Sequence, residues 1–215
     1  MAPRVLISDA LSPAAVAIFK DRGVEVDFQP DLGKDKDKLA AIIGNYDGLA
    51  IRSATKVTDK IIAEAKNLKV VGRAGIGVDN VDIPAATGKG IIVMNTPFGN
   101  SITTAEHAIA MMFAIAREIP AADASTQAGK WEKNRFMGVE ITGKVLGLIG
   151  CGNIGSIVAD RALGLKMRVL AYDPFLSPER AIDLGVEKVE LDELLAKADF
   201  ITLHAPMTEQ TRNIL

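Results

Sequence analysis

The chain has 215 residues, of which 48% are hydrophobic and 24% are charged, and its formal net charge is −2 at pH 7. This composition is ordinary for a globular protein, and the near-neutral charge argues against a general nucleic-acid surface. No apolar run approaches the roughly twenty residues that a membrane helix needs. A single cysteine excludes an intrachain disulfide, and no signal peptide is visible. We therefore expect a cytoplasmic protein with no nucleic-acid partner, no membrane partner and no metal.

The first hundred residues alternate between short β-branched or apolar runs and amphipathic helical stretches. The pattern predicts strands at 5–8, 24–28, 49–51, 68–71 and 91–94, and helices at 12–20, 35–43, 58–65 and 81–87. Such alternation is typical of a parallel sheet that is covered by helices. We therefore expect residues 1–97 to form one doubly wound, flavodoxin-like α/β domain that binds the substrate.

A turn of proline, glycine and asparagine at 96–100 ends this alternation, and an apolar helix is expected from 101 to 119. Pro120 should stop that helix, with a second helix from 121 to 129. After a more polar stretch, the pattern predicts strands at 145–149, 168–172, near 189 and at 200–203, with helices at 156–163, from 177 and at 192–196. We expect residues 98–215 to form a second doubly wound domain.

A glycine fingerprint follows the apolar run 145–149, with its glycines at Gly150, Gly152 and Gly155. In a strand-turn-helix context this G-x-G-x-x-G pattern is typical of dinucleotide binding. The first glycine permits the tight turn, the second lets a pyrophosphate approach the backbone, and the third lets the helix pack closely. The helix N-terminus then offers N–H groups to the phosphates. The pattern predicts a dinucleotide site here.

The next predicted strand ends in Asp173, eighteen residues after Gly155. A carboxylate at this place accepts hydrogen bonds from the adenosine ribose and repels a 2′-phosphate. Pro174 and Phe175 follow it, so no arginine stands directly behind Asp173 to bind that phosphate. The cofactor is therefore predicted to be NAD and not NADP.

The second domain is expected to hold only the first half of a six-stranded dinucleotide fold, with the chain stopping after the third strand. The apolar strand 145–149 belongs at the centre of a complete sheet. In this chain we expect it to form an edge with unpaired backbone groups.

A second glycine-rich turn, residues 72–77, follows the predicted strand 68–71 and contains Arg73. Successive N–H groups in such a turn form a concavity for an anion, and Arg73 adds a charged donor. Arg52 follows the neighbouring strand 49–51, so both arginines are expected at the carboxyl edge of one sheet. The alternative is a tight turn with two solvent-exposed arginines.

The sequence resembles the phosphoglycerate branch of the D-2-hydroxyacid dehydrogenase family over essentially the whole chain. The similarity lies in five segments, which are 52–57, 72–82, 93–97, 131–138 and 199–204. It implies two sets of site residues. Those for the substrate are Arg52, Arg73, Ala74, Gly75, Ile76, Gly77 and Asn100. Those for NAD are Gly150, Gly152, Asn153, Ile154, Gly155, Asp173, His204, Ala205 and Pro206.

The resemblance implies NAD-dependent oxidation of 3-phospho-D-glycerate to 3-phosphohydroxypyruvate, the first step of serine biosynthesis, in a homodimer or higher homo-oligomer. The family's catalytic arginine, glutamate and histidine lie beyond Leu215, so we expect no catalytic residue within the chain and no turnover by it alone. The alternatives are another D-2-hydroxyacid dehydrogenase, such as a glycerate or hydroxypyruvate reductase, and an NAD-sensing corepressor. His107 is expected to be a packed helix residue. Cys151 is either a small residue between glycines or a thiolate favoured by the helix N-terminus.

Overall fold

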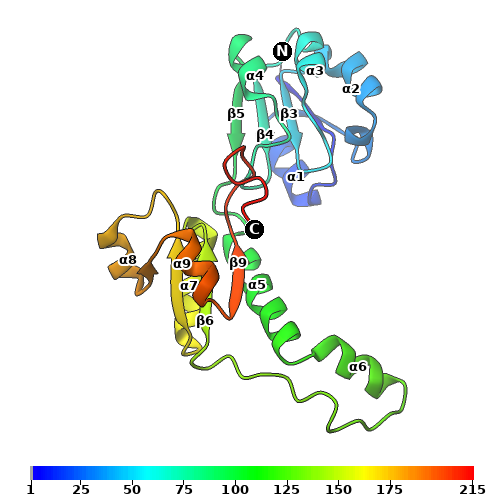
Figure 1. The fold of residues 1–215 in the computed structure, drawn as a ribbon. Coiled ribbons are helices and arrows are strands. Elements are labelled where there is room, and N and C mark those ends of the chain that lie inside the picture. The colour runs from blue at the N-terminus through cyan, green and yellow to red at the C-terminus, as the bar shows by residue number, and fades with distance from the viewer. Residues whose placement is uncertain (1) are drawn as a thin grey trace. The chain divides into compact units, whose positions relative to one another are not determined.

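The computed structural model describes residues 2–215 and divides into two compact units, Met1–Asn100 and Ser101–Leu215 (Figure 1). Each unit holds one sheet, and all strand pairings in both sheets are parallel. Helices alternate with the strands along the chain, which confirms the predicted α/β class. Among residues 2–215, no helix combines the length and apolar character that crossing a membrane requires.

The sheet of the first unit contains five short strands in the order β2-β1-β3-β4-β5. They are β1 (Arg4–Ile7), β2 (Glu25–Phe28), β3 (Gly48–Ile51), β4 (Val70–Arg73) and β5 (Ile92–Asn95). This order is that of flavodoxin-like folds, as expected. Strand β3 is buried along its whole length between β1 and β4. The carboxyl ends of β1, β3 and β4 therefore lie side by side at one edge of the sheet.

Four α-helices connect these strands, namely α1 (Pro13–Asp21), α2 (Lys36–Ile42), α3 (Asp59–Glu64) and α4 (Ile83–Gly88). Short 3₁₀ turns, η1 (Leu32–Lys34) and η2 (Ile43–Asn45), flank α2. Side chains cap three of the helices, since Ser12, Asp35 and Asp82 each accept a bond from a first-turn N–H. Thr58 occupies the cap position of α3, but its side chain makes no capping bond.

The sheet of the second unit has four strands in the order β8-β7-β6-β9, which are β6 (Val145–Ile149), β7 (Arg168–Tyr172), β8 (Glu187–Lys188) and β9 (Phe200–Leu203). Strand β6 pairs with β7 on one side and with β9 on the other. The expectation that β6 forms an edge is therefore wrong, as is the expected end after a third strand. After β8 the chain returns to the free side of β6, so β9 is the fourth strand of the sheet.

Five helices belong to this unit: α5 (Ser101–Ala116), α6 (Ile119–Gln127), α7 (Asn153–Gly164), α8 (Pro178–Leu184) and α9 (Leu191–Lys197). Small side chains of α5 and α7, among them Ala105 and Ala159, share one buried cluster with Leu146 and Leu148 of β6. On the other face Leu194 of α9 packs with Ile149 and Leu170. A Cβ at Gly147 of β6 would lie 2.5 Å from Cδ2 of Leu194, so the glycine allows this close packing.

The long helix breaks earlier than the sequence predicts. Helix α5 ends at Ala116, and Glu118 adopts a left-handed backbone conformation with φ of 53° before α6 begins at Ile119. Pro120 lies in the first turn of α6, where its missing N–H costs no helical bond, so it does not end α5. Figure 1 shows α6 and the segment after it extending away from the sheet of this unit.

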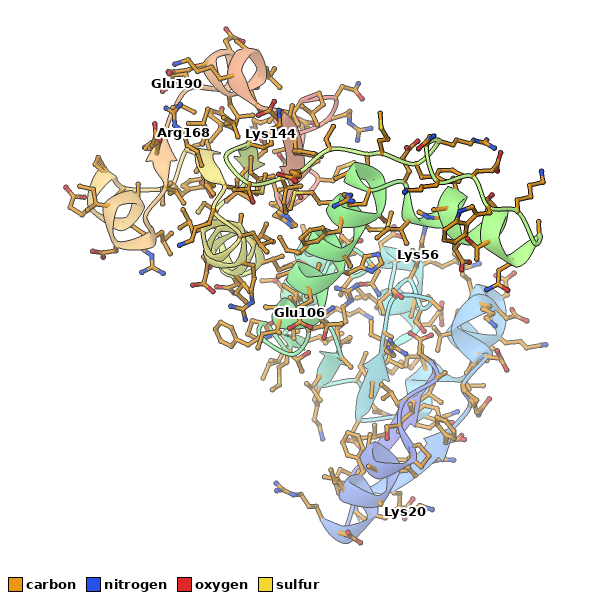
Figure 2. The ribbon with its side chains drawn as sticks, turned by 90° about the horizontal axis from the view of Figure 1, so that it is seen from below. Lys20, Lys56, Glu106, Lys144, Arg168 and Glu190 are labelled. Atoms are coloured by element: carbon orange, nitrogen blue, oxygen red, sulfur yellow. The ribbon has the colours of Figure 1, made fainter. Side chains whose placement is uncertain are left out.

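The amino ends of the second sheet are tied by ion pairs. Arg168 at the start of β7 donates two hydrogen bonds of 2.5 Å to Glu187, and Lys144, which precedes β6, lies 3.7 Å from Asp199. Figure 2 labels Arg168 and Lys144 in this part of the molecule. Such half-exposed pairs contribute little stability. They mark the amino edge, while the glycine fingerprint lies at the carboxyl edge.

The environment of Tyr46 predicts that the free energy of unfolding falls at alkaline pH. Burial and a 2.5 Å hydrogen bond to Asp27 raise the pKa of Tyr46 from 10.0 to about 12. Because the folded pKa lies above the unfolded one, this stabilisation is complete below pH 10 and is lost as the pH rises towards 12. Tyr46→Phe should cost about 1 kcal/mol at neutral pH. It should also flatten the pH dependence of unfolding in denaturant between pH 10 and 12.

Phenolate absorbance checks the assignment, because the difference in titration between the unchanged chain and the Phe variant belongs to Tyr46. Equal loss of stability across this pH range in the unchanged chain and in the Phe variant would contradict the role of Tyr46.

Candidate functional site

The fingerprint turn is held between two strand ends. Gly150 donates its backbone N–H to the carbonyl of Tyr172 over 2.9 Å, at the end of the neighbouring β7. Its φ of +90° lies in the left-handed region, and a Cβ here would lie 2.8 Å from the peptide that joins His204 and Ala205. Only glycine meets both conditions without strain. The fingerprint turn and the turn after β9 are therefore packed backbone against backbone.

The other two glycines shape the start of α7. A Cβ at Gly155 would lie 2.1 Å from the carbonyl oxygen of Gly150, whereas a Cβ at Gly152 would meet nothing within 4 Å. Helix α7 begins at Asn153, three residues earlier than predicted, and its first backbone bond runs from Ser156 to Gly152. The N–H groups of Asn153, Ile154 and Gly155 thus precede the helical ladder. Open space at Gly152 beside these donors fits a pyrophosphate.

Asp173 follows β7 and reaches across to the fingerprint. Its Oδ2 accepts a 2.7 Å hydrogen bond from the backbone N–H of Cys151, and its Oδ1 accepts one of 2.8 Å from the N–H of Phe175. The carboxylate is partly exposed. Because each carboxylate oxygen can accept a second bond, Asp173 keeps acceptor capacity towards solvent. Asp173 therefore links the ends of β6 and β7. The adenosine part of a dinucleotide is predicted to bind between these two ends.

The turn after β9 contains His204, Ala205 and Pro206. The backbone N–H of His204 donates to the carbonyl of Ile149 over 2.8 Å, and its ring Nε2 lies 2.9 Å from Oγ1 of Thr202. Burial lowers the pKa of His204 below its usual value, so the ring is neutral at physiological pH. His204 and Ala205 border the fingerprint turn, and a role of this loop in cofactor binding stays a prediction.

Cys151 lies between Gly150 and Gly152 and is buried. Burial first, and then the negative charge of Asp173, raise the pKa of the Cys151 thiol, while Arg180 on α8 opposes this shift. The thiol is therefore protonated at neutral pH, which disfavours the thiolate alternative. Among the described residues, no three histidine, cysteine or acidic side chains gather as ligands for a metal ion.

In the first unit the second glycine turn encloses its own arginine. Arg73 is the last residue of β4, and its side chain is only 12% exposed. A Cβ at Gly75 would lie 3.4 Å from the Arg73 guanidinium carbon, and one at Gly77 would lie 3.1 Å from its Nη1. Arg73 Nε is buried and has no hydrogen-bond partner among the described residues. The alternative of a fully solvated arginine is thereby excluded for Arg73.

The backbone of this turn is partly used within the chain. The N–H of Ala74 donates to Ile51 and that of Gly75 donates to Arg73. Of the predicted backbone positions, Ile76 and Gly77 are left with N–H groups outside any backbone bond among the described residues. An anion at this turn would therefore be bound mainly by these two groups and the arginines.

Arg52 follows β3 and is exposed. Its Nη1 donates a 3.2 Å hydrogen bond to the carbonyl of Ala10, just beyond β1. Strands β3 and β4 are neighbours with Ile51 opposite Arg73, so the two arginines start from adjacent strand ends. Asn100 is exposed at the end of the first unit.

Sequence reasoning assigned no function to several residues at these edges. Asp9 and Asn80 bond to both ends of the segment 52–55, at Arg52 and Thr55, although they lie far from it and from each other in the sequence. The one available signal was an acidic residue directly after the first strand. His107 was expected to pack inside the protein, which is wrong, because it is exposed on α5.

Comparison with known proteins identifies the second unit. Residues 109–215 match the family model described as "D-isomer specific 2-hydroxyacid dehydrogenase, NAD binding domain". Proteins named D-3-phosphoglycerate dehydrogenase from Archaeoglobus fulgidus and from Sus scrofa are 49% and 48% identical to the chain over 212 residues, or 99% of it. The chain spans about 40% of the length of these two relatives.

Solved structures agree in fold. A Thermus thermophilus protein is 33% identical with a TM-score of 0.88, over 97% of this chain and 66% of its own. A glyoxylate reductase from Paecilomyes thermophila is 28% identical with a TM-score of 0.87, over 100% of this chain and 68% of its own. The second unit therefore belongs to the NAD-binding domains of the D-isomer specific 2-hydroxyacid dehydrogenase family.

Proposed function

We propose that this protein oxidises 3-phospho-D-glycerate to 3-phosphohydroxypyruvate with NAD, in the first step of serine biosynthesis. The supporting observation is that relatives named D-3-phosphoglycerate dehydrogenase are 47–49% identical over both units. The first unit is thus included, and it holds the arginines that suit an anionic substrate. Another D-2-hydroxyacid dehydrogenase activity is the alternative, because solved structures of similar fold include a D-lactate dehydrogenase and a glyoxylate reductase.

NAD would accept the hydride from the substrate. The chain's own residues would bind it: the N–H groups at the start of α7 hold the pyrophosphate beside Gly152, and Asp173 accepts bonds from the adenosine ribose. The His204–Pro206 turn would border the adenosine side. Because the Asp173 carboxylate would repel a 2′-phosphate, NAD is favoured over NADP.

The carboxylate and phosphate of the substrate need cations and N–H donors. Arg73 offers a guanidinium whose buried Nε has no partner among the described residues, and Arg52 lies at the adjacent strand end. Ile76 and Gly77 add backbone N–H groups. We infer that neither histidine among residues 2–215 is the proton acceptor, since exposed His107 lies on α5 and His204 borders the fingerprint. Residues 1–215 alone should therefore bind both ligands without turnover.

We further propose a homodimer in which α5, α6 and the segment after α6 contact the partner. Large apolar side chains are exposed there, namely Met111, Ile115, Ile119, Trp131 and Met137. Exposed apolar side chains that gather on one surface are typical of protein interaction sites. We propose no nucleic-acid partner.

Arg73→Ala tests the substrate site. The variant should weaken 3-phospho-D-glycerate binding to the chain at least tenfold, because a charge-assisted contact contributes about 1.5–3 kcal/mol. NMR titration measures the dissociation constant, and NAD affinity should not change. Arg22→Ala removes an exposed arginine after α1 and is the matched control. If Arg73→Ala binds the substrate within twofold of the unchanged chain, the assignment is wrong.

Asp173→Asn tests cofactor selection. The amide keeps the size of the side chain but removes the charge that would repel a 2′-phosphate. The preference for NAD over NADP should narrow ten- to a hundredfold, on the order of 1.4–2.8 kcal/mol. Calorimetric titration with both dinucleotides measures it. Asp160→Asn, on the exposed side of α7, is the control, and an unaltered preference in Asp173→Asn would assign ribose recognition to another residue.

Light scattering tests the dimer. At micromolar concentration the chain should show twice its mass of 22.8 kDa. Ile115→Glu on α5 should reduce it to a monomer, because burying an unpaired carboxylate in an interface is unfavourable. Ile18→Glu, at an exposed position of α1, should leave the dimer intact. A monomer mass for the unchanged chain would refute the proposal.

A further inference from the structure

A buried polar cluster lies beneath the segment that contains Arg52. Ser8, Asp9 and Thr55 are at most 2% exposed, and they are three of the four buried polar side chains among residues 2–215. Buried carboxylates are rare because they lose hydration, and they persist only where hydrogen bonds compensate. The cluster lies where β1 and β3 end, at the edge where parallel sheets bind ligands.

The Asp9 carboxylate fixes both ends of the segment 52–55 through their N–H groups. Its Oδ2 accepts hydrogen bonds from the backbone N–H of Arg52 at 2.5 Å and of Thr55 at 3.2 Å. Its Oδ1 accepts the Thr55 hydroxyl at 2.9 Å, and Ser8 Oγ lies 2.8 Å from that same hydroxyl. A Cβ at Gly33 would lie 1.9 Å from Thr55 Oγ1, so the cluster leaves no room for any other residue there.

Asn80 holds the same two residues through their carbonyls. Its Nδ2 donates to the carbonyl of Arg52 and to that of Thr55, each over 2.7 Å. The N–H and the C=O of both end residues are thus bonded, which fixes the turn in one conformation. Asn80 also closes the segment that begins with Arg73 at the end of β4. It therefore connects the two arginine-bearing segments directly.

We propose that Asp9 and Asn80 are positioning residues for the substrate: by clamping residues 52–55 they set the place of the Arg52 guanidinium relative to Arg73. The inference rests on the proposed function, because it assumes that the two arginines bind one anionic 2-hydroxy acid. The strength of a hydrogen bond from a guanidinium to an anion depends on its direction. Displacement of the turn should therefore weaken substrate binding even though Arg52 is still present.

The test is an NMR titration of the chain with 3-phospho-D-glycerate, beside a separate NAD titration. Asp9→Ala removes the acceptor, and Asn80→Ala removes the double donor. Asp9→Asn is the conservative variant, because its amide oxygen can replace Oδ2 while its NH₂ group donates to Thr55 Oγ1. Two controls carry similar bonds in the first unit: Asp47→Ala, whose carboxylate accepts the Arg4 N–H, and Asn67→Ala, whose amide donates to Gly44.

Asp9→Ala and Asn80→Ala should weaken phosphoglycerate binding at least tenfold, Asp9→Asn should regain most of that loss, and both controls should bind within twofold of the unchanged chain. NAD affinity should stay the same in all five. If Asp9→Ala does not fold, Asp9→Asn and Asn80→Ala decide. Phosphoglycerate binding within twofold of the unchanged chain in Asn80→Ala would overturn the positioning role.

Failure of the proposed function gives a different result. If the unchanged chain does not bind phosphoglycerate, the same titration is run with D-glycerate, D-lactate and hydroxypyruvate. Binding of one of these with the same dependence on Asp9 and Asn80 would support positioning and contradict the proposed substrate. Binding of none of them would overturn both.

Discussion

The parallel pairing of β6 with a neighbour on each side is the constraint on which the cofactor site depends. Because β7, β6 and β9 run in the same direction, the segments that follow them emerge at one edge of the sheet. Two backbone bonds then fix these segments to the adjacent strand ends, one from Gly150 to Tyr172 and one from His204 to Ile149. The fingerprint turn, Asp173 and the His204 turn are neighbours for this reason, although Gly150 and His204 are 54 positions apart in the sequence (204 − 150).

Within that edge, each glycine of the fingerprint satisfies a different physical requirement. Gly150 combines a left-handed backbone with contact to another peptide, Gly155 packs on the carbonyl of Gly150, and Gly152 leaves open space. The bond from Cys151 N–H to Asp173 closes the arrangement, and the same burial and charge keep the Cys151 thiol protonated. The site is thus preorganised chiefly by backbone geometry, with Asp173 as its main side-chain support.

The first unit reaches a comparable arrangement by other means. Its edge is organised around a buried carboxylate, and the Arg52–Thr55 segment is bonded on one side by Asp9 and on the other by Asn80. Arg73 is enclosed by glycines of its own turn and has a buried donor without a partner among the described residues. Two arginines therefore lie where adjacent strands end, an arrangement that suits a small anion.

Local patterns in the sequence were sufficient to predict the α/β class, most of the strands and the fingerprint, because periodicity and glycine spacing depend on neighbouring residues alone. The helix break at Glu118 was missed, since a left-handed non-glycine residue leaves no local signal. The central place of β6 was missed as well, because strand order depends on how a crossover folds back, and β9 could not be placed by its own sequence. Only the tertiary structure brought Asp9, Thr55 and Asn80 together, since contacts across 25 to 46 residues form where strands meet in space and not where residues are adjacent in the chain.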